Sequence, residues 1–211
     1  MPAASAGLPF IVSTMLSFKE YVSTLLDLTE EEWSFFSQRL TPRFFEKGDI
    51  ICRPGEVCQF VLFVQEGLAY SYMLDPAGKQ FIWEFYYNSH EAAMGNLFAV
   101  DCPSFMFRQP GQFYIEALSP VQGWAVDLQG VREIFDQNDK WRQLGSVVGS
   151  MANRDTQNRA VSLLSEPAAD RYQRLVREMP ALLQLVPLRH IAAYLGITPQ
   201  SLSRLRKHMA V

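Results

Sequence analysis

The stretch VPLRHIAAYLGITPQSLSRLRK, residues 186–207, decides the fold of the C-terminal part of this chain. Its residues Ile191, Ala192 and Leu195 lie on one face of a helix, and this face is apolar. Gly196 follows at the position where a left-handed residue commonly ends a helix. The spacing therefore predicts a short helix that ends in a tight turn.

A second helix is predicted directly after that turn. Thr198 supplies an N-cap, and Pro199 suits the first helical position. Leu202 and Leu205 are spaced to pack against the first helix, which leaves a basic, hydroxyl-rich face toward solvent. A helix-turn-helix of this kind can place its second helix in the major groove of DNA. An ordinary helical hairpin with a solvated basic face is the alternative.

Charge is distributed unevenly along the 211 residues. The net charge is -3, but residues 1–153 carry 10 Lys and Arg against 18 Asp and Glu, a net of -8. Residues 154–211 carry 9 against 4, a net of +5. A basic block on an acidic body suits phosphate binding by the C-terminal part alone.

Cysteine usage and hydropathy indicate a cytoplasmic protein. Cys52, Cys58 and Cys102 are too few for a disulfide scaffold or for the four thiolates of a usual iron–sulfur cluster, and we expect free thiols. No apolar run is long enough to span a bilayer, and residues 8–12 lack the basic flank of a signal peptide. Residues 1–14 are interpreted as a disordered leader or as the product of an upstream start.

The centre of the chain has a strand pattern. Two capping boxes, Ser17 with Glu20 and Thr29 with Glu32, open packing helices before it. The period then changes to two, with turn signals at short, even intervals, which predicts a β-sandwich or barrel. The predicted strands are Thr41–Phe45, Asp49–Cys52, Gln59–Glu66, Leu68–Leu74, Phe81–Tyr86, Phe113–Ala117 and Val121–Val126. Aromatic residues are expected to fill the barrel: Phe60, Phe63, Tyr70, Tyr72, Phe81, Trp83 and Phe85.

An irregular segment, residues 89–112, interrupts this rhythm. Residues 90–98 are predicted to form a short helix, followed by a loop punctuated by prolines. An insert of this kind within a barrel is a common position for a ligand pocket.

A long helix is predicted from Asn138 or Asp139 to about Leu164. Its apolar stripe suits a parallel seam between two copies, and it equally suits a helix that lies on the barrel. The stripe consists of Trp141, Leu144, Val148 and Met151. Residues 165–167 are the predicted hinge to the C-terminal helices.

With these elements in order, the chain resembles the cyclic-AMP receptor protein/Fnr (Crp/Fnr) family of bacterial transcription regulators over roughly residues 41–208. The motifs that carry the resemblance are FEKG at 45–48, RPGE at 53–56, VQEG at 64–67, DPAG at 75–78 and LGITPQSLSR at 195–204. The chain looks closest to a short-tailed branch, because after the second helix no room is left for a β-wing before Val211.

The resemblance implies an α+β protein with three parts. A cyclic-nucleotide-binding-like β-roll (a jelly-roll barrel) precedes a long dimerisation helix and a helix-turn-helix domain. The expected segments are a leader at 1–14, N-terminal helices and sensor barrel at 15–137, the long helix at 138–164, and the DNA-binding domain at 165–211. The family implies a homodimer that sets two recognition helices into successive major grooves of double-stranded DNA. RNA polymerase is a possible further partner.

The expected effector pocket departs from the family pattern. Members that bind cyclic AMP carry a Gly-Glu pair for the ribose and an Arg-Ser/Thr pair for the phosphate. Here Met94 and Gly95 are followed by Asn96 in place of the glutamate, and Gln112 lies near the place of the arginine pair. Arg108 is out of register. A buried phosphate would lack a cation, so cyclic AMP is expected to bind weakly or not at all. The effector is unknown, no cofactor is expected, and a filled barrel without a ligand is the alternative.

Other site chemistries find little support. A cupin-like metal centre needs two or three histidines on strands, but two of the three histidines, His190 and His208, lie in the helical domain. His90 or a cysteine would be the candidate axial ligand for haem. No nucleophile–base set, phosphate loop or carboxylate pair is evident. We therefore expect neither a metal site nor an enzyme.

The predicted DNA contacts have two roles. Arg204 and Gln200 are four residues apart, share a helix face and can read guanine and adenine. In the family, an arginine and a glutamate often occupy the positions of Pro199 and Gln200, so the half-site should differ. Thr198 and the free N–H groups of the first turn form an anion site. The hydroxyl groups of Ser201 and Ser203 can form hydrogen bonds with phosphates or bases. The cations expected to neutralise phosphate are Arg189, Arg206, Lys207 and His208. The competing hypothesis is a ligand-binding barrel whose helical tail docks a protein.

Overall fold

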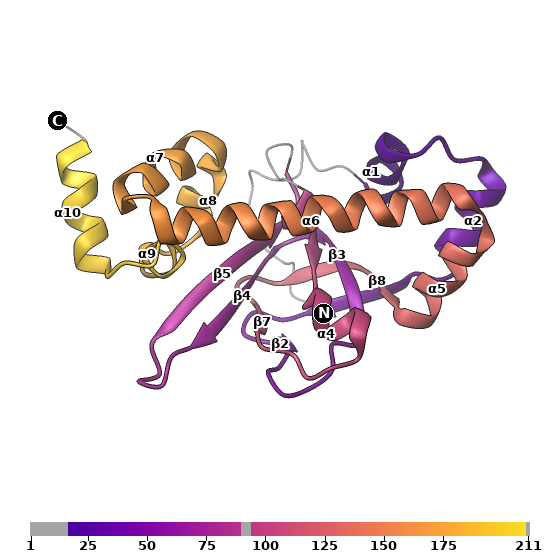
Figure 1. Cartoon of the computed structure of the whole chain (residues 1–211), viewed down its shortest axis with the longest axis horizontal. Helices are drawn as coiled ribbons and strands as arrows, with labels where there is room; N and C mark the ends of the chain where they lie inside the picture. The colour runs from indigo at the N-terminus through magenta and orange to yellow at the C-terminus, as the bar shows by residue number, and fades with distance from the viewer. Residues whose placement is uncertain (1–16, 90–93, 210–211) are drawn as a thin grey trace, which may run out of the picture.

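The computed structural model describes residues 17–89 and 94–209. One long helix crosses the molecule, with the β-roll beneath its middle, two N-terminal helices at one end and the C-terminal helices at the other (Figure 1). The predicted leader, residues 1–14, and the candidate haem ligand His90 lie outside the described residues. The predicted α+β class, with β-roll, long helix and helix-turn-helix in that order, is confirmed.

The β-roll consists of two four-stranded sheets with orders β1-β8-β3-β6 and β2-β7-β4-β5, and every pairing is antiparallel. The strands are β1 Thr41–Phe45, β2 Ile50–Cys52, β3 Phe60–Glu66, β4 Leu68–Leu74, β5 Gln80–Tyr87, β6 Phe98–Ala99, β7 Tyr114–Ala117 and β8 Val121–Asp127. The period-two pattern predicted all of these within a residue or so except β6, which is too short to show a pattern.

Glycine allows β3 and β8 to approach closely. A Cβ at Gly123 would lie 1.9 Å from the carbonyl oxygen of Phe63. Gly67 has a positive φ of 92°, and a Cβ there would lie 2.0 Å from the carbonyl oxygen of Pro120. Both positions therefore require glycine for steric reasons.

Mostly small and aliphatic side chains fill the roll, and of the aromatic residues predicted there Phe60 packs against them. The cluster between the sheets contains Leu62, Val64, Ala69, Ile115, Ala117, Val121 and Ala125, with Tyr86 and Phe105. Tyr70, Tyr72 and Phe85 instead pack against the C-terminal helices, and Phe63 packs against the N-terminal ones. Alternation along a strand identifies the two faces of a sheet. It does not show which face lines the interior of the roll and which is covered by helices, because both faces are apolar here.

The helices are α1 Phe18–Leu25, α2 Glu30–Ser37, α3 Met94–Leu97, α4 Cys102–Phe107, α5 Leu128–Gln137, α6 Asp139–Ser165, α7 Ala168–Glu178, α8 Pro180–Leu185, α9 Leu188–Tyr194 and α10 Pro199–Met209. Both predicted capping boxes, at Ser17 and Thr29, are formed. Asn138 caps α6 through its side chain, and residues 166–167 separate α6 from α7. No described helix is long and apolar enough to cross a membrane.

The predicted dimer stripe on α6 begins with a residue that is buried within the protomer. Trp141 is only 1% exposed and stacks on Phe36 of α2, with ring centroids 5.1 Å apart and planes 4° apart. Leu144 packs against the same cluster, and Val148 and Met151 are half-buried. Trp141 is therefore covered within the protomer, whereas the dimer role of Leu144, Val148 and Met151 stays a prediction.

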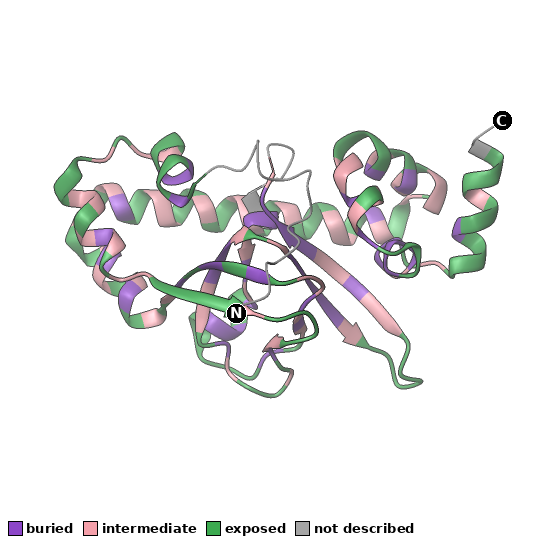
Figure 2. Ribbon diagram, turned by 180° about the vertical axis from the view of Figure 1, so that it is seen from behind, coloured by how far each residue is buried: buried purple, intermediate pink, exposed green. Residues whose placement is uncertain are grey.

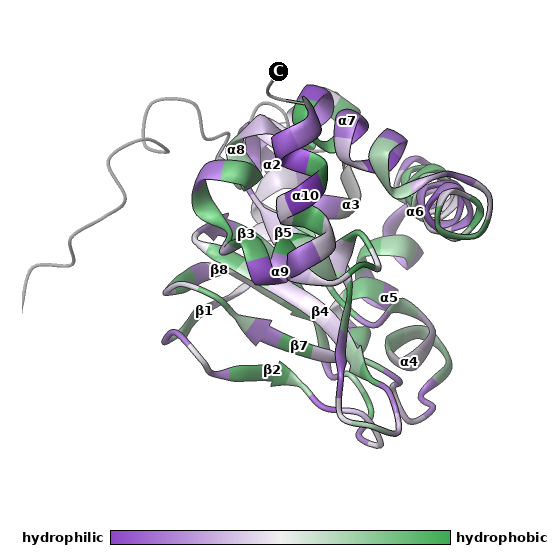
Figure 3. Ribbon diagram, turned by 90° about the vertical axis from the view of Figure 1, so that its left-hand side faces the viewer, coloured by the Kyte–Doolittle hydropathy of each residue, from purple (hydrophilic) through white to green (hydrophobic). Residues whose placement is uncertain are grey.

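The opposite face of α6 lies open to solvent. Its exposed residues include a row spaced alternately by three and four, namely Val147, Ser150, Arg154, Gln157, Val161 and Leu164. Three of these are large apolar side chains, and Leu164 is 89% exposed. In the end-on view, α6 lies at the side of the molecule (Figure 3).

Candidate nucleic-acid interface

The helix-turn-helix forms as the sequence predicted. Gly196 takes a φ of 69° and ends α9. The backbone N–H of Ser201 donates to Thr198 Oγ1 at 3.1 Å, so Thr198 caps α10. Leu202 is 1% exposed, and Leu205 packs against the same cluster as α9. These contacts fix α10 relative to α9.

One face of α10 presents polar side chains to solvent. This helix lies at the end of the molecule farthest from α1 and α2 (Figure 1), and most of its surface is exposed (Figure 2). The hydropathy view shows hydrophilic residues along it (Figure 3). The predicted contact residues found exposed on or beside α10 are Thr198, Gln200, Ser201, Ser203, Arg204, Arg206, Lys207 and His208.

Arg189 is exposed on α9, next to a buried histidine. Its Nε donates to His190 Nε2 at 3.3 Å. His190 stacks on Tyr70 of β4, and its Nδ1 has no hydrogen-bond partner in the structure. Burial, and then the charge of Arg189, lower the pKa of His190 below 6.5. The periodic pattern did not distinguish this buried histidine from a surface one.

A hollow of 540 Å³ lies beside α10, between α7 and α9. Its lining includes Val176 and Leu188, which are 41% and 44% exposed, together with Arg206 and Lys207. The lining thus combines apolar and basic side chains.

Aromatic stacking holds the helix-turn-helix against the β-roll. His190 begins a row that continues through Tyr70, Tyr72 and Tyr114, with centroids 5.2, 5.2 and 4.9 Å apart. Phe85 of β5 also contacts Tyr194 of α9. The outer face of β4, β5 and β7 is thus the docking surface for the C-terminal helices.

Two arginines bind the C-terminal carbonyls of α9. Arg159 of α6 donates to the carbonyl oxygens of Tyr194, Ile82 and Trp83, and its guanidinium lies 3.7 Å from the Tyr194 ring centroid. Arg171 of α7 donates to Leu195 O at 2.8 Å. Cations are favourable at a helix C-terminus, where carbonyls lack partners within the helix.

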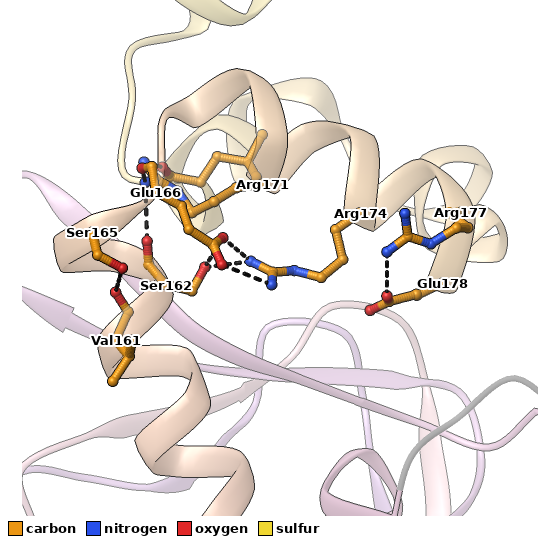
Figure 4. Close-up of polar contacts among 9 residues, drawn as sticks. Val161, Ser162, Ser165, Glu166, Arg171, Arg174, Arg177 and Glu178 are labelled. Carbon is orange, nitrogen blue, oxygen red and sulfur yellow. Dashed lines mark hydrogen bonds and ion pairs between the residues drawn. The ribbon is translucent and has the colours of Figure 1, made fainter.

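A second polar cluster links the end of α6 to α7 across residues 166–167, the hinge (Figure 4). Ser162 Oγ donates to Glu166 Oε2 at 2.8 Å, and Arg174 makes a two-pronged contact with the Glu166 carboxylate. Arg171 also donates to the carbonyls of Ser162 and Glu166. The hydrogen bonds from Arg174 and Ser162 hold the pKa of Glu166 below its ordinary value. The hinge is therefore tied by directional contacts.

The candidate effector residues do not share one described cluster. Asn96 is 2% exposed, and its amide donates to Glu84 Oε1 and to Phe85 O, both at 2.9 Å. Gln112 is exposed, and its backbone N–H donates to Asp101 Oδ2. Met94 and Gly95 begin α3, but their side chains lie outside the described part.

Two further features of this region bear on ligand binding. Burial raises the pKa of Glu84, and the charge of Arg159 partly offsets this. Arg108, the nearest arginine in sequence, is held in the left-handed conformation that ends α4 and donates to Cys58 O and Gln59 Oε1. Its guanidinium is thus engaged with the loop before β3.

Helix α4 was predicted as loop. Asp101 caps it by accepting from Ser104 N, and Pro103 lies in its first turn. An aspartate just before a proline is a helix-start signal, so the sequence held the information. Among the described residues, no group of three or more His, Cys, Asp or Glu is arranged to hold a metal ion.

Several solved structures have a similar fold. FixK2 from Bradyrhizobium japonicum is 18% identical, with 81% of this chain and 84% of that chain covered and a TM-score of 0.67. A Crp/Fnr-family regulator from Eubacterium rectale is 16% identical over 87% and 84%, with a TM-score of 0.65. CooA from Carboxydothermus hydrogenoformans is 16% identical over 90% and 83%, with a TM-score of 0.64. These likenesses confirm the Crp/Fnr-type fold. No protein-family model and no curated protein matches the sequence.

His190 makes stability depend on pH. The His190 imidazole takes up a proton less readily in the folded protein than in the unfolded chain. Its contribution to stability is therefore fully present above pH 6.5 and is lost as the pH falls from 6.5 toward the lowered pKa of the folded state. His190→Phe should flatten the slope of unfolding free energy against pH, measured by urea denaturation. His208→Phe, at an exposed position, is the control and should leave the slope unchanged. Equal slopes in wild type and His190→Phe would refute the assignment.

Proposed function

We propose that the protein is a homodimeric transcription regulator of the Crp/Fnr type that binds double-stranded DNA through α10. The observation that carries the proposal is the exposed polar face of α10 on a helix that buried Leu202 fixes to α9. The net charge of +5 over residues 154–211 adds long-range attraction to phosphates. We infer a cytoplasmic protein, with RNA polymerase as a further partner, and no catalytic activity.

Roles on α10 follow from side-chain chemistry. Arg204 can contact guanine O6 and N7 bidentately, and Gln200, one turn earlier, can contact adenine. Both are exposed on α10. Lys207 can neutralise phosphate, which adds affinity without sequence preference. The hydroxyl groups of Ser201 and Ser203 can form hydrogen bonds with phosphates or bases.

Docking of a protein is the second candidate function. The 540 Å³ hollow favours it, because Val176 and Leu188 expose apolar surface beside Arg206 and Lys207. The two functions differ in their dependence on salt. Binding of duplex DNA should weaken steeply as salt rises, whereas binding to an apolar floor should not.

We propose that the exposed row on α6 is the dimer seam. Spacings of three and four from Val147 to Leu164 match the inward positions of a parallel two-stranded coiled coil. Val161 and Leu164, exposed in the protomer, would become buried by a second copy. This seam is the face opposite the one that Trp141 occupies.

The sensor barrel is proposed not to bind cyclic AMP. Asn96 is committed to Glu84 and Phe85, and Arg108 to the loop before β3. The carboxylate that Asn96 contacts near α3 is Glu84, and burial raises its pKa. The packed cluster between the sheets supports a filled barrel.

Base-reading and phosphate-binding residues should respond differently to mutation. After selection of bound sites from random duplexes, Arg204→Ala should lose about 1–3 kcal/mol on the selected site and relax one position. Lys207→Ala should weaken binding to selected and random duplexes alike and reduce the salt slope by roughly one. Fluorescence anisotropy at several salt concentrations measures both. Identical behaviour of the two variants would refute the assigned roles, and no binding at low salt would refute DNA binding.

Introducing like charges into the proposed seam on α6 should dissociate the dimer into monomers. Val161→Glu with Leu164→Glu places like charges at two adjoining seam positions and removes buried apolar area, about 1.5–3 kcal/mol per side chain. Sedimentation velocity should show a monomer, and far-ultraviolet circular dichroism should show that this monomer is still folded. Thr156→Glu, exposed on α6 outside the row, is the matched control and should remain dimeric. A dimer in the double variant would exclude this seam.

Cyclic AMP should not stabilise the protein. A ligand that binds only the folded state raises the melting temperature. Thermal unfolding with millimolar cyclic AMP should therefore give the same midpoint as with millimolar AMP, the control nucleotide. A concentration-dependent rise with cyclic AMP alone would contradict the proposal.

A further inference from the structure

The hollow beside α10 runs along about two turns of that helix. Its lining residues on α10 begin at Pro199, in the first turn, and end at Lys207. Pro199 and Arg206 are seven positions apart, which is about 10 Å along a helix axis. Val176 of α7 and Leu188 of α9 line the same hollow. It is therefore long enough to take several side chains of a partner in a row.

Apolar surface in the hollow is left uncovered. Val176 and Leu188 are the two large apolar lining residues that stay exposed, whereas Leu202 beneath α10 is buried. The core of this module is formed by other faces of the same helices, which bury Leu175 of α7 and Ile191 of α9. Val176 and Leu188 are thus free to be covered by a partner, which would remove apolar area from water.

The charge of the hollow is of one sign. Among the described residues that line it, the charged ones are Arg206 and Lys207. Residues 179–211 contain four Lys and Arg and no Asp or Glu. Over residues 17–89 and 94–209, no carboxylate forms an ion pair with Arg206 or Lys207. The hollow therefore complements an acidic partner, whose carboxylates would not have to displace others.

The hollow also lies away from the proposed base-reading residues. Successive residues of a helix are rotated by about 100°, so Arg206 points about 160° away from Arg204. Neither Gln200 nor Arg204 lines the hollow. Lys207 lies between the two faces. A partner in the hollow can therefore contact α10 without covering Gln200 and Arg204.

A second copy of this chain does not suit the hollow. The acidic helix of the chain is α2, with Glu30, Glu31 and Glu32 in its first turn. This helix lies at the opposite end of the molecule from α10 (Figure 1). In the proposed parallel dimer these two ends do not meet, and a head-to-tail contact between copies would not close into a dimer. The occupant must therefore be another protein.

We propose that the hollow is a docking site for an acidic amphipathic helix of a partner protein. Apolar side chains at positions i, i+4 and i+7 of the partner helix would cover Val176 and Leu188. Carboxylates beside them would pair with Arg206 and Lys207. This inference rests on the second candidate function, docking of a protein, and names the chemistry of the partner. It does not require DNA binding, so it and the proposed regulator function can fail separately.

A defined peptide tests the site. The probe is a fluorescein-labelled, lactam-stapled helix of about three turns, with leucine at i, i+4 and i+7 and glutamate at the flanking positions. Full-length protein is titrated into the probe, and fluorescence anisotropy is measured in the absence of DNA. We expect saturable binding. A peptide of the same composition, with its leucines spread around the helix, is the control and should bind about tenfold more weakly.

Two variants locate the bound peptide. Leu188→Ser removes exposed apolar surface, and Arg206→Glu reverses a charge, so each should weaken binding about tenfold. Arg177→Glu is the matched control, because Arg177 is exposed on α7 outside the hollow and its replacement changes the net charge equally. It should bind the peptide as the wild type does. Far-ultraviolet circular dichroism checks that each variant is folded, and either hollow variant alone suffices for the test.

Random duplex DNA separates the docking site from the proposed DNA interface. Leu188→Ser should bind the duplex as tightly as the wild type. The proposal would be overturned by an absence of saturable peptide binding, or by equal peptide affinities of the wild type and the hollow variants. It would also be overturned if Leu188→Ser lost duplex and peptide affinity to the same extent. Binding of the peptide without any binding of duplex at low salt would refute the regulator function alone.

Discussion

The position of α10 depends on the hydrogen-bond partners that the carbonyls at the end of α9 require. The last carbonyls of a helix have no donor within it, and leaving them buried and unbonded is costly. Arg159 and Arg171 supply the donors, one from α6 and one from α7. Because Arg159 also binds the carbonyls of Ile82 and Trp83, one guanidinium joins the long helix, the β-roll and the helix-turn-helix. The orientation of α10 is thus set by the same contacts that tie these three parts together.

Apolar packing surrounds this polar link and gives it its strength. Tyr70 and Phe85 lie on the outer face of the sheet and contact His190 and Tyr194 of α9. Excluding water there strengthens each hydrogen bond to Arg159, because the local dielectric is low. A helix-turn-helix that swung away would expose these aromatic rings and leave the carbonyls to water. The docked arrangement is therefore one cooperative unit of polar and apolar contacts.

Local signals in the sequence were sufficient to predict the fold. They were not sufficient to predict which part of the molecule each apolar face packs against. Thr198 and Gly196 predicted the turn correctly, because capping and positive φ act within a few residues. The strand periods likewise located the β-roll. Trp141 was misassigned to the dimer seam, because a helical period shows that a stripe is apolar without showing what covers it.

Helix α6 shows why periodicity could not tell a face that packs on the protomer from a face that is open to a second copy. One face packs Trp141 and Leu144 on the protomer, and the other carries the row from Val147 to Leu164. A helix of 27 residues is about 40 Å long, which is enough to contact the N-terminal helices and the hinge at once. Trp141 and Leu144 commit one face to the cluster that holds the N-terminal helices, which leaves the outer row open to solvent. Any rotation of α6 about its axis would move both faces together, so a partner bound at the proposed seam would also act on the contacts of Arg159.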